Sequence, residues 1–253
     1  MAKDAPKPAS GEVTFVKKPA KVGEKTTKKS HRVTDMKFSV KGKEVPFHEE
    51  FDSEYTRETL AIDATSGLAT KAKVTYAKHV KAQTTDGKAA PVDKVLDGKT
   101  FVIERKGTSI VVTDEAGKPV PAAEEKLVAK EHKSFGKADE ATTALVAKPR
   151  KVGDDLSDVA KALALKMAGD DDGGNEVKDL KFSLKSIDAT TSTFDTSFTA
   201  VGEKGDLTIK LAGTVKVQND DVDLGEVNLS GPLTLTGKAN ATGTLTSTEV
   251  ESH

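Results

Sequence analysis

The sequence predicts an all-β or β-dominated fold, with two related antiparallel β units and one covering amphipathic helix. Three observations carry this prediction. Apolar and polar residues alternate along many short segments, as half-buried strands require. Turn signals separate these segments at intervals of about 8–12 residues, which is typical of antiparallel meanders. A short apolar–polar segment near the start recurs in the second half of the chain, which indicates an internal duplication.

The amino-acid composition excludes several classes of protein. The chain has 253 residues, 36% of them hydrophobic, which suits one large domain or two small ones. Its 39 basic and 40 acidic side chains leave a net charge of -1, so the basic excess of a nucleic-acid-binding domain is absent. The sequence contains no cysteine, which excludes disulfides, thiol catalysis and cysteine-ligated metals. No apolar run is long enough for a membrane-spanning helix, which needs about 18 residues or more.

Residues 1–30 read as a flexible N-terminal tether with a first strand, because they are polar and rich in Pro, Lys and Ala. The first β unit is expected over residues 31–148. It begins where Met36, Phe38 and Val40 alternate with Lys37 and Ser39. Glycine-containing turns at 66–67, 86–87 and 106–107 then mark hairpins. Residues 122–135 favour a helix, with a strand as the alternative.

The second β unit is expected over residues 149–253, with a helix at about 155–168. That helix is predicted by an apolar stripe at helical spacing, which runs from Leu156 through Val159 and Leu163 to Met167. From Glu176 onward, alternating segments and polar turns predict an antiparallel meander.

The duplication is predicted by a seven-residue match. Asp35–Lys41 reads DMKFSVK and Asp179–Lys185 reads DLKFSLK, so five positions are identical and the other two exchange one apolar residue for another. Shorter matches keep the same order along the chain, while the loop lengths drift. We therefore expect Phe38 and Phe182 in equivalent inward positions of two similar units.

A second kind of similarity lies in the middle of the chain. The segments Phe135–Asp139 (FGKAD) and Lys148–Asp154 (KPRKVGD), followed by a helix and by strands ending in Leu229–Pro232 (LSGP), resemble a group of uncharacterised secreted proteins and lipoproteins from myxobacteria-like bacteria. The resemblance covers about residues 130–240. It implies export from the cytoplasm, and the group has no established activity to transfer.

No catalytic constellation, metal site or cofactor-binding motif emerges from the sequence. His48-Glu49-Glu50 lacks the second histidine of a metal motif, and the acidic segments 170–176 and 219–223 read as solvated loops. We therefore predict no catalytic residue, no bound metal and no cofactor. Four phenylalanines are candidates for lining an apolar ligand site: Phe38, Phe182, Phe194 and Phe198. The alternative is that these side chains only fill the core.

These observations favour a non-catalytic protein of the cell envelope that acts as a structural or binding module, outside the cytoplasm. The absence of cysteine and the tether-like opening support this location, in the periplasm, at the outer membrane or outside the cell, with a lipid anchor as one native form. The partner is expected to be a protein or an apolar ligand. The first alternative is a carrier of a lipid or other apolar ligand in a pocket between a β-sheet and a helix. The second is an acid-based hydrolase.

Overall fold

The computed structural model describes residues 11–40, 43–154, 156–170, 176–202, 205–236 and 240–253. The chain forms two compact units: unit 1 comprises Met1–Lys18 and Asp139–Gly231, and unit 2 comprises Pro19–Ala138 and Pro232–His253. Antiparallel strands dominate, which confirms the predicted fold class. Both units are discontinuous in sequence, whereas the predicted segments 1–30, 31–148 and 149–253 are each continuous. Pairing of the last strand of the chain with the first long strand brings the C-terminal segment into unit 2, and pairing of two short strands places the N-terminal segment in unit 1.

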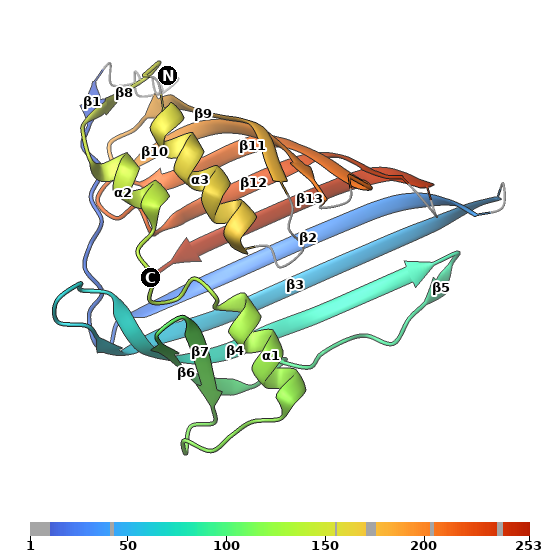
Figure 1. Ribbon diagram of the computed structural model, residues 1–253, viewed down its shortest axis with the longest axis horizontal. Helices are drawn as coiled ribbons and strands as arrows, with labels where there is room; N and C mark the ends of the chain where they lie inside the picture. The colour runs from blue at the N-terminus through green and yellow to red at the C-terminus, as the bar shows by residue number, and fades with distance from the viewer. Residues whose placement is uncertain (1–10, 41–42, 155, 171–175, 203–204, 237–239) are drawn as a thin grey trace, which may run out of the picture. The chain divides into compact units, whose positions relative to one another are not determined.

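Unit 2 is an antiparallel sheet that carries a helix (Figure 1). Its strands follow the order β7-β6-β4-β3-β2-β13, and β5 pairs with β4. The elements are β2 (Lys25–Val40), β3 (Lys43–Ile62), β4 (Ala69–Thr85), β5 (Lys88–Ala89), β6 (Thr100–Lys106), β7 (Ser109–Thr113), α1 (Ala122–Glu131) and β13 (Asn240–Ser252). The helix α1 confirms the helix predicted within residues 122–135, and it ends at Glu131.

Strands β2 and β3 are 16 and 20 residues long, far longer than their alternating apolar segments suggest. Their polar stretches stay in the sheet because charges on neighbouring strands lie opposite one another. Lys29 pairs with Glu54 at 3.0 Å, and Lys28 pairs with Glu249 of β13. Cross-strand pairs of opposite charge stabilise a sheet by about 0.2–1 kcal/mol each. A strand can therefore continue where hydrophobic alternation stops.

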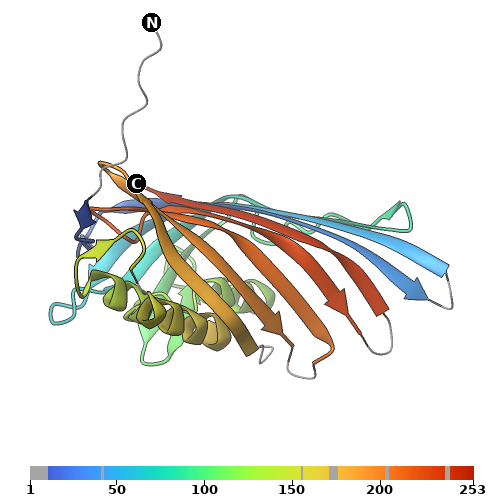
Figure 2. The same ribbon diagram turned by 90° about the horizontal axis from the view of Figure 1, so that it is seen from above.

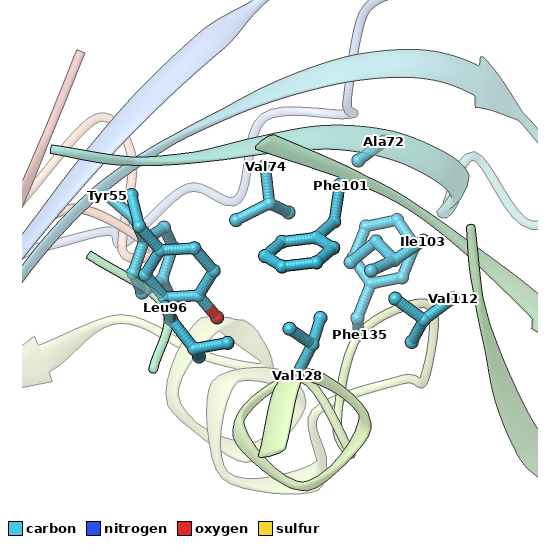
Figure 3. Packing of buried hydrophobic residues seen from close by; sticks show 10 residues of the cluster. Tyr55, Ala72, Val74, Leu96, Phe101, Ile103, Val112, Val128 and Phe135 are labelled. Atoms are coloured by element: carbon cyan, nitrogen blue, oxygen red, sulfur yellow. The ribbon is translucent and has the colours of Figure 1, made fainter. Parts of the chain in front are cut away.

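The core of unit 2 lies between α1 and the sheet (Figure 3). Val128 is the buried residue of α1 and packs against side chains from β4 and β6. Val74 and Ile103 are fully buried there, and Phe101 keeps only 2% of its accessible surface. The single buried residue explains why the apolar face of this helix looks thin in the sequence.

Unit 1 has a sheet with the strand order β12-β11-β10-β9 and a separate pair of short strands, β1 and β8. Strand β12 crosses the unit boundary at Gly231. The elements are β1 (Glu12–Val13), α2 (Glu140–Val146), β8 (Arg150–Lys151), α3 (Ser157–Asp170), β9 (Glu176–Ile187), β10 (Thr191–Val201), β11 (Leu207–Gln218) and β12 (Gly225–Leu235).

The helix α3 confirms the predicted amphipathic helix, shifted by two residues. Leu156 and Val159 are buried in a cluster with Leu184 of β9, and Leu163 is half-buried. The side chain of Met167 lies outside the described part of the structure. Among the described side chains, Leu156 and Val159 therefore anchor the start of this helix beside β9 (Figure 2).

The short helix α2 was not predicted, because its seven residues are too few to show a helical period. Its sequence signal is the N-cap: the Asp139 carboxylate accepts hydrogen bonds from the backbone N–H groups of Ala141 and Thr142. Arg150 then joins the two helices. Its fully buried guanidinium donates to the Ala144 carbonyl at 2.7 Å and to the Asp158 carboxylate at 2.8 Å.

A glycine in β13 is required by the close approach of β2. A Cβ added at Gly243 would lie 1.9 Å from the carbonyl oxygen of Asp35, so the two strands would have to separate. We expect Gly243→Ala to lower the free energy of unfolding by about 1–3 kcal/mol, the usual cost of overpacking. Chemical denaturation measures this, and the exposed neighbour Thr242→Ala serves as control, with a change within about 0.5 kcal/mol. Equal losses in the two variants would contradict the role of Gly243.

The internal duplication is not confirmed. Asp35–Lys41 lies largely on β2, which has neighbours on both sides, whereas Asp179–Lys185 lies on β9, at the end of the strand order. Each segment begins a meander of long antiparallel strands. The equivalence of Phe38 and Phe182 stays a prediction.

Candidate functional site

A hydrogen-bonded network of ionisable side chains joins α1 to β4 in unit 2. The Tyr76 hydroxyl donates to Glu131 Oε2 at 2.8 Å and lies 3.2 Å from His132 Nε2. His79 Nε2 lies 2.8 Å from Glu131 Oε1. Both oxygens of one carboxylate are therefore engaged, one by Tyr76 and one by His79.

A β-bulge places Tyr76 and His79 on the same face of β4. Tyr76 lies opposite Tyr55 and His79 lies opposite Ser53, so one extra residue of β4 is accommodated between these pairs. Without the bulge, residues three apart on a strand would point to opposite faces. This network is not visible in the sequence, because the bulge interrupts the alternation of side chains between the two faces of β4.

Burial and the partner charges set the protonation of the network. Burial opposes ionisation of Glu131, but the hydrogen bonds from His79 and Tyr76 hold the pKa of its carboxyl below the usual value. Burial also opposes the charged form of His79, and its bond to Glu131 raises the pKa of His79 despite this. These directions favour a His79⁺–Glu131⁻ pair at neutral pH.

The second histidine behaves differently. Burial, reinforced by the positive charge of Arg57, lowers the pKa of His132 to about 4. The Tyr76 phenol is also buried beside Glu131, which raises its pKa and keeps it a proton donor. His132 is therefore neutral at physiological pH, whereas the pKa of the other imidazole, His79, is shifted in the opposite direction.

The network includes the residue types of an acyl-transfer triad, since Ser53 lies directly opposite His79. Ser53 Oγ and His79 Nδ1 are both buried, and neither has a hydrogen-bond partner in the described part of the chain, so they do not bond to each other. Ser53 keeps 7% and His79 6% of its accessible surface. What the described contacts show is that Glu131 of α1 is tied to two residues of β4, Tyr76 and His79, so the network holds the helix on the sheet.

The four singled-out phenylalanines do not form one group. Phe182 stacks on Phe194 with ring centroids 4.6 Å apart, and both belong to unit 1. Phe194 is fully buried and also contacts Phe15, so it fills the core. Phe198 lies four residues further along β10 on the same face. Phe38 belongs to unit 2, where its ring meets Phe47 edge-on at 5.9 Å.

The segments weighed for metal binding have other partners. His48 Nδ1 lies 2.8 Å from Asp35 Oδ1, on an exposed face of the sheet. Asp220 and Asp223 form ion pairs with Lys18 and Lys17 at the connection between β11 and β12. Asp170 ends α3, and residues 171–175 lie outside the described part of the chain.

Comparison with known proteins adds little. The chain matches no protein-family description and no curated protein. Among solved structures, DynF from the dynemicin biosynthesis pathway of Micromonospora chersina is similar to the chain at 10% identity, covering 99% of this chain and 90% of that one. The TM-score of 0.21 is too low to support an argument. The resemblance to uncharacterised secreted proteins therefore stays a prediction. None of the described helices combines the length and apolar character needed to cross a membrane.

Proposed function

We propose that this protein is a non-catalytic binding module that holds an acyl-chain-like apolar ligand on the helix-bearing face of the unit 1 sheet. One observation carries the proposal: the apolar face of that sheet continues beyond the region covered by buried core residues. All residues of the proposed ligand site belong to unit 1.

The covered part of the face lies near the β9–β10 turn. There Leu184 and Phe194, which are direct partners across the strands, pack with Leu156 and Val159. The helix α3 has 14 residues and spans about 21 Å, whereas the 12 residues of β9 span about 40 Å. Even laid parallel to β9, a helix of this length would reach along only about half of the strand.

The remaining part of the face is apolar and half-exposed. Phe198 lies opposite Leu211, and Ala200 lies opposite Ile209, so all four share the face of Phe194. Leu211, Ile209 and Ala200 are half-buried and stand outside the core cluster of unit 1, although Phe198 itself is buried. The intervening residues on the opposite face, such as Lys210 and Ala212, are exposed.

The chemistry of this region fits an apolar chain better than a polar ligand. The four side chains offer methyl, methylene and aromatic groups and carry no charge. The two strands that carry these side chains, β10 and β11, lie about 4.8 Å apart, so the four residues form a narrow apolar strip along the strands. Burial of such a chain is favourable by about 0.8 kcal/mol for each methylene group removed from water.

Titration with cis-parinaric acid, a fluorescent fatty acid, tests the proposal. The protein has no tryptophan, so its own fluorescence interferes little. We expect saturable binding to the wild type and a loss of about tenfold in affinity for Leu211→Gln, since a buried leucine contributes about 1.5–3 kcal/mol and tenfold corresponds to 1.4 kcal/mol.

The matched control is Ala212→Gln, which introduces the same side chain one residue along, on the opposite and exposed face. Its affinity is expected to stay within twofold of the wild type. Absence of saturable binding to the wild type, or equal losses in the two variants, would contradict the proposal.

Location outside the cytoplasm is a further part of the proposal, supported by the cysteine-free composition and the polar Pro- and Lys-rich segment 1–30. Fractionation of the native host, with mass measurement of the mature N-terminus, tests both the location and a lipid anchor. Recovery of the protein only with cytoplasmic markers would contradict it.

A further inference from the structure

A second group of side chains lies in unit 2, on the sheet face that points away from α1. Tyr55 and Ser53 of β3 face the helix side, so Asp52 and Glu50 face the other side. On β2, His31 lies directly opposite Asp52, and Glu50 is the diagonal neighbour of His31 because its own partner is Val33. The β2–β3 register therefore brings an imidazole and two carboxylates together.

The distances suit a shared cation. His31 Nδ1 lies 2.8 Å from Asp52 Oδ1 and 4.0 Å from Glu50 Oε1. The three ligand atoms all lie within 4.8 Å of one another. Tetrahedral zinc has ligand distances of about 2.0–2.2 Å, which places its ligand atoms about 3.3 Å apart. Small side-chain rotations close this difference, because the His31 and Glu50 side chains keep 45% and 47% of their accessible surface.

We propose that His31, Glu50 and Asp52 form a surface site for a divalent transition metal of the zinc type. One imidazole nitrogen and two carboxylate oxygens are ligands that zinc accepts, and water completes the coordination in a three-ligand site. The imidazole distinguishes the site from one for calcium or magnesium, which take oxygen ligands. The site is exposed, so the metal exchanges with solvent.

Lys78 is expected to weaken the binding of a metal at this site. Its Nζ lies 2.8 Å from Asp52 Oδ2, on the carboxylate oxygen that does not face His31. This ammonium group neutralises part of the charge that would attract a metal. It also holds the Asp52 carboxylate in place, and the hydrogen bonds from Lys78 and His31 lower the pKa of Asp52 and keep it ionised.

The same sheet face provides a matched comparison. His48 Nδ1 lies 2.8 Å from Asp35 Oδ1, the same contact that joins His31 to Asp52. Among the described residues, however, the group of three convergent ligands consists of His31, Glu50 and Asp52 and does not include this pair. If zinc binding needs three convergent ligands, replacing His31 will weaken it and replacing His48 will not.

The test is an isothermal titration calorimetry experiment, in which ZnCl₂ is titrated into the full chain after treatment with a chelator. We expect His31→Gln and Glu50→Gln each to weaken zinc binding at least tenfold, and His48→Gln to leave it within twofold of the wild type. Lys78→Gln is expected to tighten binding severalfold, an effect that a purely structural role of these residues would not produce. Circular dichroism confirms that each variant folds.

A parallel titration with CaCl₂ completes the test. Calcium binding equal in strength to zinc binding, and unaffected by His31→Gln, would identify an acidic patch and overturn the proposal. Equal losses of zinc affinity in the His31 and His48 variants, or the absence of zinc binding to the wild type, would also overturn it. The proposed fatty-acid site lies in unit 1 and the proposed metal site lies in unit 2. The two proposals are tested by separate titrations, so either one can fail without the other.

Discussion

Replacing Phe194 by alanine is expected to lower the free energy of unfolding by about 3–5 kcal/mol, the usual cost of removing a buried aromatic side chain. Phe194 is fully buried at the centre of the unit 1 cluster. Its ring stacks on Phe182 at 4.6 Å and lies 5.7 Å from Phe15, so the variant would leave a cavity beside these two rings. Urea denaturation followed by far-ultraviolet circular dichroism measures the change.

Phe38→Ala is the matched control, because it removes the same atoms from a half-exposed position in a strand. A loss of no more than about 2 kcal/mol is expected there, since less apolar surface is buried. A larger loss for Phe38→Ala than for Phe194→Ala would contradict the assignment of Phe194 to the core.

Acid is expected to destabilise the protein between pH 6.5 and pH 4 through His132. Its pKa is about 4 in the folded protein and near 6.5 in the unfolded chain, so the unfolded state binds more protons in this window. The free energy of unfolding therefore falls as the pH is lowered, by roughly 3 kcal/mol at pH 4. Glu131, whose folded pKa is lowered, adds a further loss below about pH 4.5.

His132→Gln tests this assignment, because glutamine does not titrate and its amide can still donate to the Tyr76 hydroxyl. We expect the stability of the variant, measured by denaturation at each pH, to change little between pH 6.5 and pH 4.5. His48→Gln, at an exposed position, should keep the slope of the wild type. An unchanged slope in His132→Gln would show that another group causes the acid loss.

Above neutral pH, the free energy of unfolding is expected to change in the opposite direction and to fall as the pH rises. The pKa of His79 is raised in the folded protein by its bond to Glu131, so its contribution is complete below pH 6.5 and is lost as the pH rises through the folded pKa. Stability measured by denaturation across pH is therefore expected to fall on both sides of a maximum, on the acid side through His132 and on the alkaline side through His79.

Local physical chemistry determined much of the fold from the sequence alone. Alternation at Met36 and Phe38 predicted strand β2, and the helical spacing of Leu156 and Val159 predicted α3. Turn glycines were also readable, since Gly87 and Gly107 adopt the positive φ angles that favour glycine. These features depend on residues close together in the chain, so their signals survive in a single sequence.

Only the tertiary structure decided which strands pair and which polar side chains meet. Pairing of β13 with β2 brings the C-terminal strand beside the first long strand and makes unit 2 discontinuous in sequence. The bulge in β4 brings Tyr76 and His79 to one face, and the β2–β3 register places His31 beside Asp52 and Glu50. Register is a property of two strands together, because a shift by one residue would turn every side chain of a strand to the other face. For that reason the phenylalanines were visible in the sequence, whereas the buried network and the zinc-type site were not.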